Sequence, residues 1–516
     1  MSSAAANTIM SGQPHHAPAK KLAALLAGIS EGVPVSAQVA DLTLDSRRVS
    51  SGAAFVALPG LRSHGVAFAA DAVAAGATAV LWEPTTNVVA PTLPTGVVVI
   101  AIPELTRKLG AIADRFFDAP SKSIRVAGVT GTNGKTTTAY MLAAALERLG
   151  EASAYAGTLG VGRVAAPRSR VHTTPDCISV HRELAELRDT GVRSLGMEVS
   201  SHALDQHRVA GVRFDAAVFT NLTHDHLDYH GTFEAYGAAK MRLFEWPDLQ
   251  HAVINFDDAF GRQIASRAQT AAVTLYGRDP ALPAYAASQS RRCHIRAVSV
   301  AADAFGMHIE IDSSWGHAYL RSRLIGDFNV DNLLAVLATL LGFDIPLADC
   351  VNALEACTAP PGRMEMLTAP DRPTVIVDYA HTPDALDKTL RAIRNHCAGR
   401  IVCVFGCGGE RDAAKRPLMG AIAERLADAV IVTDDNPRNE DGDRIVETIV
   451  RGMQQPQRAC VQRDRAAAIA SAIAQARAGD VVLIAGKGHE DYQIVGGVKR
   501  SFSDRDVALS ALGRGS

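Results

Sequence analysis

A short run of glycine, threonine and asparagine around one lysine is the strongest chemical signal in the sequence. Residues 130–138 read TGTNGKTTT and follow the apolar segment Ile124–Val129. The backbone N–H groups of such a turn, with the N-terminus of a following helix, can hold a polyphosphate. Lys135 would reach the β- and γ-phosphates, and the Thr136 hydroxyl would ligate Mg²⁺. Val129 takes the first glycine position of the strict motif, so the segment predicts a nucleotide-using protein without defining its reaction.

Four polar loops in the last third of the chain form a second signal. Each follows an apolar segment and is dense in glycine, histidine, arginine and acids: DYAHTPDAL, GCGGERD, TDDNPRNED and GKGHED. In a parallel sheet, ligands bind beyond the carboxyl ends of the strands. The four loops therefore predict a functional site in this part of the chain, whatever family it belongs to.

A third cluster, HDHLDYH, lies in the middle of the chain. It holds five potential metal ligands: His224, Asp225, His226, Asp228 and His230. On composition alone, a zinc site is one interpretation. The other is a set of ordinary capping and surface side chains.

The elements that position these groups are those of an α/β protein. At roughly 100–200 residues per domain, 516 residues suggest about three domains. The first is a small α/β unit with expected strands DLTLDSRRV, AAFVAL, GATAVLWE and GVVVIAI. The second begins as strand, Gly-rich turn and helix (Thr137–Leu149), the start of a parallel-sheet domain. Its later elements are expected to be strands at Ser194–Val199, Ala216–Asn221 and His251–Asn255 and a helix over Asp327–Leu341.

The third unit is the most regular. The expected strands PTVIVDY, RIVCVFG, DAVIVTD and DVVLIAG alternate with helical segments. Continuous apolar strands alternating with helices predict a Rossmann-like, doubly wound parallel sheet. The predicted division is a disordered tail over residues 1–18, an N-terminal domain over 19–107, a central domain over 108–357 and a C-terminal domain over 358–516.

Composition excludes several classes of function. The net charge of -2 gives no global basic field for nucleic acid or a membrane surface. No segment has the roughly 18 apolar residues of a membrane span, and the N-terminus has no secretory signal. Eight cysteines without a paired framework fit a reducing compartment, and Cys403 and Cys407 are interpreted as core residues. We expect a cytoplasmic protein, a monomer, with no nucleic-acid or membrane partner.

Beyond the phosphate loop, six segments occur in order between residues 197 and 442, within a match that covers about residues 42 to 495: MEVSSHALDQHRV, FTNLTHDHLDYHGTFEAYGAAK, GDFNVDN, PPGRME, VDYAHTPDAL and DDNPRNEDG. In these motifs the chain resembles the Mur ligase family. The resemblance implies three domains that bind a UDP moiety, ATP and an incoming amino acid. It also implies an ATP- and Mg²⁺-dependent ligase of peptidoglycan precursor biosynthesis. The implied reaction adds meso-diaminopimelate to the D-Glu γ-carboxylate of UDP-MurNAc-L-Ala-D-Glu through an acyl phosphate.

The resemblance also implies roles for residues around the nucleotide. Lys135, Glu198, His226 and Lys240 are expected to be catalytic. The expected Mg²⁺ ligands are Thr136, Glu198, His226 and Lys240, the last carrying a carbamate. The expected ATP contacts are Gly131, Thr132, Asn133, Gly134, Lys135, Thr136, Thr137, Asn329, Arg363, Asp378, Tyr379 and His381.

The other implied residues bind the two further substrates. Those for the UDP-linked substrate are Leu44, Ser46, Leu61, Arg62, Ser63, His172, Thr173, Thr174, Ser200, Gln206 and Arg208. Those for the amino acid are Arg411, Asp435, Asn436, Pro437, Arg438, Gly486 and Glu490. A guanidinium fork fits a carboxylate, so Arg438 is expected to select an amino acid with a distal carboxylate.

Two other functions stay open. Folylpolyglutamate synthase shares the phosphate loop, although it gives no reason for the first domain or for DNPR. A nucleotide-binding regulator would hydrolyse ATP without needing an added amino acid. The general base is also open, since either His381 or the substrate complex itself can take the proton.

Overall fold

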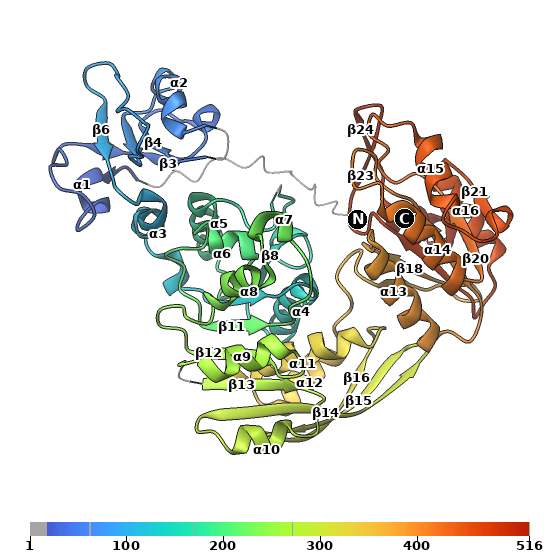
Figure 1. Cartoon of the computed structure of the whole chain (residues 1–516). Coiled ribbons are helices and arrows are strands. Elements are labelled where there is room, and N and C mark those ends of the chain that lie inside the picture. Colours follow the sequence, from blue (N-terminus) through green and yellow to red (C-terminus); the bar gives the residue numbers. More distant parts are fainter. Residues whose placement is uncertain (1–17, 61–62, 171, 271, 515–516) are drawn as a thin grey trace, which may run out of the picture.

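The computed structural model describes residues 18–60, 63–170, 172–270 and 272–514. The predicted tail, apart from Pro18, and the predicted site residues Leu61 and Arg62 lie outside the described residues. Figure 1 shows three units in chain order, coloured blue, green to yellow, and orange to red. In the part of the chain described, no helix combines the length and apolar character needed to cross a membrane.

The N-terminal unit is built on a four-stranded parallel sheet. Its strands follow the order β3 (Asp41–Thr43), β4 (Ala53–Ala57), β5 (Ala79–Trp82) and β6 (Val98–Ala101). The prediction of one strand over DLTLDSRRV was wrong beyond Thr43. Residues Ser46–Arg48 form a 3₁₀ turn, because the Asp45 side chain accepts a hydrogen bond from the N–H of Arg47 and bends the chain there.

Short elements complete this unit: β1 (Lys20–Lys21), α1 (Leu22–Leu25), β2 (Gln38–Val39) and α2 (Ala69–Ala74). Helix α3 (Leu105–Phe116) connects it to the central unit. Leu105, Leu109 and Phe116 of α3 lie in one core with Leu42 and Val56 of the N-terminal sheet. The proposed domain boundary at residue 107 therefore falls inside a helix that packs on the first sheet.

The central unit contains a ten-stranded sheet in the order β16-β15-β14-β13-β12-β11-β7-β10-β8-β9. Its strands are β7 (Arg125–Thr130), β8 (Ser153–Gly157), β9 (Gly160–Gly162), β10 (Ser194–Glu198), β11 (Ala216–Phe219), β12 (His251–Asn255), β13 (Ala272–Gly277), β14 (Arg292–Asp303), β15 (Gly306–Ser313) and β16 (Gly316–Ser322). Its helices are α4 (Lys135–Arg148), α5 (Cys177–Asp189), α6 (Ser201–Asp205), α7 (Leu227–His230), α8 (Phe233–Met241), α9 (Ala259–Arg267), α10 (Leu282–Ala287), α11 (Phe328–Gly342) and α12 (Leu347–Glu355).

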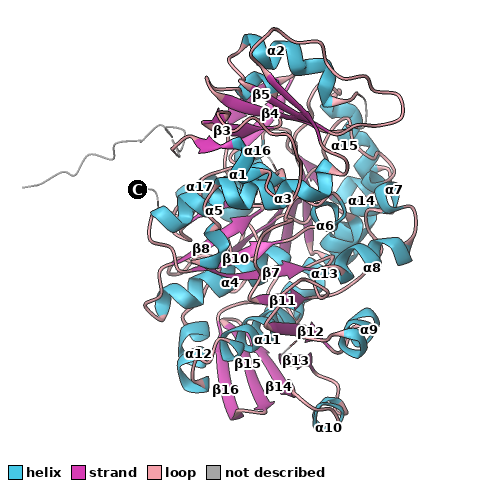
Figure 2. Ribbon diagram, turned by 90° about the vertical axis from the view of Figure 1, so that its left-hand side faces the viewer, coloured by secondary structure: helices cyan, strands magenta, loops and turns pink. Residues whose placement is uncertain are grey.

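Two hydrophobic cores cover the two faces of this sheet. Helices α4, α11 and α12 pack on one face, and α5, α6, α8, α9 and α10 pack on the other. The sheet is mixed rather than purely parallel: β14 is parallel to β13, but β15 is antiparallel to β14, β16 to β15 and β9 to β8. Strands β14, β15 and β16 extend away from the N-terminal sheet (Figure 2). Burial alternates along β15, as in a sheet that is covered on one side only.

The C-terminal unit confirms the predicted doubly wound sheet. Its order is β17-β18-β22-β19-β20-β21, with only β17 antiparallel to its neighbour. The strands are β17 (Glu365–Leu367), β18 (Thr374–Asp378), β19 (Ile401–Phe405), β20 (Ala429–Val432), β21 (Ala459–Val461) and β22 (Val481–Ala485), beside a hairpin of β23 (Tyr492–Val495) and β24 (Val498–Ser501). The helices are α13 (Pro383–His396), α14 (Lys415–Leu426), α15 (Gly442–Val450), α16 (Arg465–Gln475) and α17 (Asp504–Ala511).

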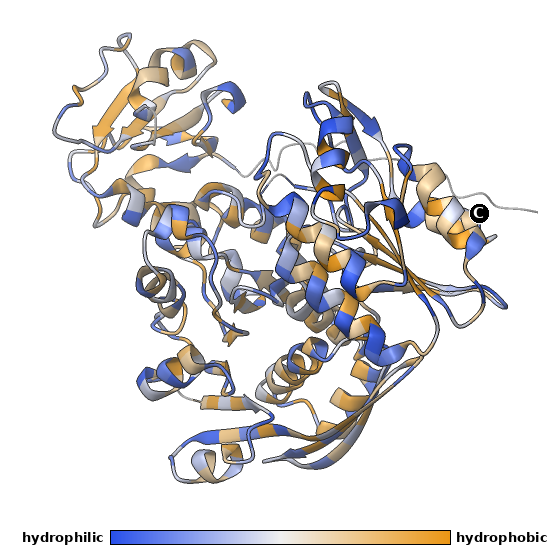
Figure 3. Ribbon diagram, turned by 45° about the vertical axis from the view of Figure 1, so that its right-hand side comes forward, coloured by the Kyte–Doolittle hydropathy of each residue, from blue (hydrophilic) through white to orange (hydrophobic). Residues whose placement is uncertain are grey.

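Helices cover both faces of this last sheet and pack against its apolar strands. Helices α13, α14 and α15 share a core on one face, and α16 and α17 share a core on the other. Figure 3 shows the strands as mainly hydrophobic and the helices as hydrophobic on one side only. Cys403 and Cys407 are buried in the first of these cores, as interpreted from the sequence.

Candidate functional site

The phosphate loop lies between the carboxyl end of β7 and the first residue of α4. Gly131 and Gly134 have φ of 149° and 84°, values that favour glycine. A Cβ on Gly131 would lie 1.9 Å from Thr220 Oγ1, and one on Gly134 would lie 2.4 Å from Asn332 Oδ1. The loop therefore accepts only glycine at both positions. The helix after it starts at Lys135, two residues before the predicted start at Thr137.

The segment after β11 holds this loop from one side, a contact that sequence reasoning missed. Thr220 Oγ1 donates to the Asn133 carbonyl at 2.6 Å, and Asn221 Oδ1 accepts from the Asn133 N–H at 3.0 Å. Thr132 Oγ1 lies 3.1 Å from the Tyr236 hydroxyl of α8. Residues 219–221 (Phe-Thr-Asn) begin one of the family motifs, but nothing in their composition indicates that they contact the phosphate loop.

Two lysine side chains converge on one carbonyl of the phosphate loop. Lys135 Nζ donates to the carbonyl oxygen of Gly131 at 2.9 Å, and Lys240 Nζ donates to the same atom at 2.8 Å. Lys240 lies within α8, is 1% exposed, and its Nζ stands 4.4 Å from the centre of the Tyr236 ring. Burial and the charge of Lys135 lower the pKa of Lys240 well below its usual value. Lys240 is thus no solvated surface lysine.

Glu198 ends β10 with its carboxylate buried. It accepts hydrogen bonds from the Tyr155 hydroxyl, from the Thr158 N–H at 2.9 Å and from the Thr158 hydroxyl at 3.2 Å. Burial, and then the charge of Glu198, raise the pKa of Tyr155 well above its usual value, which keeps this hydroxyl a donor. Tyr155 and Thr158 are therefore partners that the sequence did not point to.

His226 immediately precedes α7, and its ring lies 6.1 Å from the ring of Tyr236. Its side chain is about half exposed and lies 3.4 Å from Asp225. Its ring stacks edge-on with His202 at 4.8 Å. Among the described residues, no three or more His, Cys, Asp or Glu side chains form a group that could hold a metal ion.

A large pocket lies where the N-terminal unit meets α5. Its volume is about 1390 Å³, and the predicted residues Leu44, Ser46 and His172 line it together. Five arginines also line it: Arg47, Arg48, Arg168, Arg170 and Arg182. Arg182 joins the two units, because it donates to Asp41 Oδ1 at 2.7 Å. Ser63, also predicted for this site, is not among its lining residues.

The residues predicted to hold the peptide part form a hydrogen-bonded group behind this pocket. Arg208 donates to Gln206 Oε1 at 2.6 Å and to the Thr174 carbonyl at 2.9 Å. Thr174 Oγ1 donates to the Glu198 carbonyl at 3.0 Å. Ser200 caps α6 through the Ala203 N–H. A further predicted residue, Thr173, lies 3.2 Å from the Thr158 hydroxyl.

The residues predicted for the adenosine side come from α11 and the start of the C-terminal unit. Arg363 stacks 4.7 Å above the Tyr379 ring, and its Nε is buried with no hydrogen-bond partner among the described residues. Asp378 accepts from the N–H groups of Met364 and Ala380, at 2.7 and 3.0 Å. It therefore holds its own loop in place.

Asn329 links α11 to the phosphate-loop helix. Its Oδ1 accepts from Asn332 at 2.8 Å, and Asn332 in turn accepts from Thr138 of α4 at 3.2 Å. Asn332 was not predicted from the sequence.

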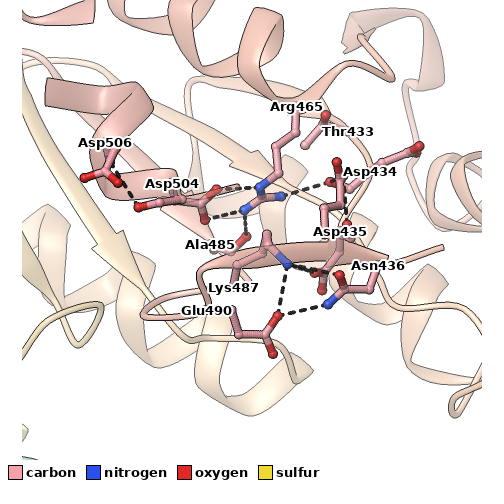
Figure 4. A network of polar contacts seen from close by, with 12 residues as sticks. Thr433, Asp434, Asp435, Asn436, Arg465, Ala485, Lys487, Glu490, Asp504 and Asp506 are labelled. Carbon is pink, nitrogen blue, oxygen red and sulfur yellow. Dashed lines mark hydrogen bonds and ion pairs between the residues drawn. The ribbon is translucent and has the colours of Figure 1, made fainter. Parts of the chain in front are cut away.

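The predicted amino-acid residues meet at the ends of β20 and β22 (Figure 4). Asn436 donates to Glu490 Oε2 at 2.9 Å, and Lys487 Nζ, completely buried, donates to both side chains. Arg438 has a φ of 55° and donates to the Gly409 carbonyl at 2.7 Å. Arg411 is exposed beside them. The sequence indicated the DNPR and GKGHE motifs, but it gave no indication of the role of Lys487.

Three family models match the chain in the order of its units. They are the Mur ligase family, catalytic domain, over residues 38–117, the Mur ligase middle domain over 129–340, and the Mur ligase, glutamate ligase domain, over 362–488. The chain belongs to the Mur ligase family.

Individual relatives narrow this class. The chain is 51% identical over 480 residues to a UDP-N-acetylmuramoyl-L-alanyl-D-glutamate--2,6-diaminopimelate ligase of Xanthomonas campestris pv. campestris (strain 8004), covering 92% of this chain and 94% of that protein. It is 48% identical over 474 residues to the ligase of the same name from Pseudomonas aeruginosa, covering 92% and 95%.

Solved structures agree in fold. A UDP-N-acetylmuramoyl-L-alanyl-D-glutamate--2,6-diaminopimelate ligase is 33% identical with a TM-score of 0.70, over 96% of this chain and 99% of that one. A folylpolyglutamate synthase of Mycobacterium tuberculosis, complexed with ADP and AMPPCP, is 19% identical with a TM-score of 0.56 and covers 74% of this chain.

Proposed function

We propose that this chain is an ATP- and Mg²⁺-dependent ligase that joins meso-diaminopimelate to the D-Glu γ-carboxylate of UDP-MurNAc-L-Ala-D-Glu. The main support for the proposal is that charged side chains of the central and C-terminal units lie close enough to act on one another. Burial lowers the pKa of Lys135 in the phosphate loop. The charges of Glu198 and Asp225 oppose this shift, and the charge of Arg363 in the C-terminal unit adds to it. The charge of Glu198 acts on His489 of the GKGHE loop. Loops that could bind an amino acid therefore face the loop that could bind ATP.

The reaction has two chemical stages. In the first, a γ-carboxylate oxygen of D-Glu attacks the γ-phosphorus of ATP, ADP leaves, and an acyl phosphate forms. In the second, the amine attacks the acyl carbon, the tetrahedral intermediate loses phosphate, and an amide remains. Catalysis of such steps is mainly positioning and electrostatic stabilisation. Lys135 and the N-terminus of α4 supply positive charge to the phosphates in this scheme.

Mg²⁺ would be held by Thr136, Glu198 and His226, and when bound it would neutralise phosphate charge. Thr136 and Glu198 offer the oxygen ligands that a hard cation prefers. Lys240, as a carbamate, would add an anionic oxygen. Burial supports this modification, because a neutral amine is the form that reacts with carbon dioxide and a buried site favours the neutral form.

The attacking amine must lose a proton, either to His381 or within the substrate complex. His381 Nδ1 lies 2.8 Å from the Tyr379 carbonyl oxygen, so Nδ1 carries the hydrogen and Nε2 is the acceptor. Burial lowers the pKa of His381, which keeps the ring neutral at neutral pH. Both features suit a group that accepts a proton.

The amino-acid pocket offers charges of both signs. Arg438 makes no ion pair within the described ranges, so its guanidinium is available for a distal carboxylate. Glu490 and Asp435 provide carboxylates for an ammonium group. The far end of diaminopimelate carries an ammonium and a carboxylate, so it can pair with the carboxylates and with the guanidinium of the pocket.

The pocket beside the N-terminal unit suits the UDP moiety. Arg48 makes no ion pair within the described residues and can face a diphosphate, whereas the other four arginines are paired with carboxylates. Leu44 and Ser46 can contact the uridine. Folylpolyglutamate synthase is the less favoured alternative, because a solved synthase matches 74% of this chain at 19% identity, whereas a diaminopimelate ligase matches 92% of it at 51% identity.

Phosphate release with UDP-MurNAc-L-Ala-D-Glu and a panel of amino acids tests the proposal. Release should require ATP, Mg²⁺, the UDP-linked substrate and diaminopimelate together. Release that is independent of any amino acid would instead support an ATP-hydrolysing regulator, and release that depends on a folate and glutamate would support the synthase.

A further inference from the structure

Lys487 is completely buried next to Asp435 and Asn436 of the DNPR loop, as is a second cation, Arg465 (Figure 4). Its Nζ lies 3.1 Å from Asn436 Oδ1, 3.0 Å from Glu490 Oε2 and 3.5 Å from Asp435 Oδ1. An ammonium group has three hydrogens to donate, and a buried charge is costly without such partners. Lys487 therefore connects three side chains of the proposed amino-acid pocket and leaves no side-chain atom exposed.

The second buried cation, Arg465, does not neutralise this cluster. Its Nε and Nη2 pair with Asp504 at 2.6 and 2.7 Å, and both side chains are fully buried. Its other contacts are with the carbonyl oxygens of Asp434 and Ala485, at 3.3 and 3.0 Å. Within the described ranges, Lys487 is thus the lysine or arginine that forms ion pairs with Asp435 and Glu490.

Two carboxylates and one ammonium leave this cluster with one negative charge in excess. Glu490 uses Oε2 for both Asn436 and Lys487, which leaves Oε1 without a hydrogen-bond partner in the described part of the chain. Asp435 Oδ1 is buried and accepts no hydrogen bond from any residue that the structure describes. Acceptors that are already oriented and not yet used are what an incoming ammonium group requires.

We propose that Lys487 is a positioning residue of the amino-acid site: it holds Glu490 and Asn436 in one arrangement and offsets one of two carboxylates, so that the pocket keeps a single excess negative charge for one substrate ammonium. This inference rests on the proposed function of the pocket. It assigns to Lys487 no contact with the substrate.

Removing this cation should change how the pocket takes up protons. Without Lys487, Asp435 and Glu490 would repel each other, so one carboxyl would bind a proton more readily and the substrate ammonium would lose its partner. Other charged and titratable groups that act on these carboxyls or on their loops remain in place: Arg465, Arg438, Tyr379, His381, Tyr492, His489 and Cys407.

The test compares Lys487→Met with the parent chain by steady-state kinetics across a pH series. Lys487→Met should raise the KM for diaminopimelate about tenfold or more at neutral pH while the KM for ATP stays unchanged. The acid limb of kcat/KM for diaminopimelate should move to higher pH by about one unit or more. Lys388→Met removes an exposed lysine of the same unit and should keep the parental limb.

The double variant Lys487→Met with Glu490→Gln restores the charge balance. Its acid limb should return to the parental pH, although its KM for diaminopimelate stays high because Glu490 is gone. A parental limb in Lys487→Met, an ATP KM that rises equally, or a displaced limb in the double variant would overturn the proposal.

The proposal can be tested even if the Lys487→Met variant does not fold. If Lys487→Met does not fold, the double variant decides alone, and its failure to fold would show that the lysine serves folding rather than charge balance. A parent chain that does not use diaminopimelate would instead contradict the proposed function, which is a separate result.

Discussion

Lys135 and Lys240 donate to the same atom, the carbonyl oxygen of Gly131, although they come from two different helices. Burial lowers the pKa of both ammonium groups, and the charge of Lys135 lowers the pKa of Lys240 further. A bound polyphosphate would draw Lys135 away from this carbonyl, and a carbamate on Lys240 would turn the repulsion into attraction. The first two predictions follow from this pair.

Lys135→Ala should reduce phosphate release to background. The ammonium is the side chain of the loop that can reach the β- and γ-phosphates, and its loss leaves their charge uncompensated. The α4 helix should survive, because alanine favours a helix. Phosphate release and the thermal unfolding temperature are the two measurements, with Lys388→Ala as the control. Undiminished release would contradict the role of the phosphate loop.

Lys240→Ala should be severely impaired, and a short carboxylic acid added to the assay should restore part of the rate. The acid can enter the space left by the side chain and supply the missing anionic oxygens. The same acid should not help Lys135→Ala, whose defect is the loss of a cation. An active Lys240→Ala variant would remove the basis for a carbamate.

Asp504→Ala should strongly destabilise the C-terminal unit. It leaves Arg465 as a buried charge without its counterion, which typically costs about 3–5 kcal/mol. The matched control is Asp384→Ala, because the exposed Asp384–Lys388 pair on α13 should contribute less than about 1 kcal/mol. Thermal unfolding of both variants measures the difference. Equal effects would mean that Arg465 finds other partners.

Much of the site could be predicted from the sequence, for physical reasons. The phosphate loop and the polar loops after β18, β19, β20 and β22 stand out because glycine, charge and strand endings are local properties. Contacts between distant segments could not be predicted. Tyr155 reaches Glu198 only because β8 and β10 are neighbours, and the burial of Lys240 depends on how α8 packs on the loop.

The antiparallel strands β14, β15 and β16 were missed for a related reason. Met307, Ile309 and Ile311 alternate with polar residues along β15, a pattern that indicates a strand with one face open to solvent. Burial along β14 and β16 alternates less regularly, and no Gly-rich motif marks any of the three. No predicted site residue lies on these strands, so missing them affected the prediction of the fold but not that of the site.

Arg438→Ala should raise the KM for diaminopimelate and lower its kcat/KM, with little change in the KM for ATP. A charge-assisted, bidentate pair in a desolvated pocket is worth about 2–5 kcal/mol when one partner is removed, or roughly thirty-fold to several thousand-fold. Arg438→Lys should not restore activity, because an ammonium cannot present the guanidinium fork. If Arg438→Ala keeps the parental preference for diaminopimelate over L-lysine, this specificity claim fails.

The most direct test is a competition between meso-diaminopimelate and L-lysine at equal concentrations, with UDP-MurNAc-L-Ala-D-Glu, ATP and Mg²⁺. Mass spectrometry of the UDP-linked products measures which amide forms, and a phosphate assay measures the ATP used. We predict a product enlarged by one diaminopimelate minus water, one phosphate released per amide, and little or no lysine product. Phosphate release without an enlarged UDP-linked product, or equal amounts of the two amides, would contradict the proposed function.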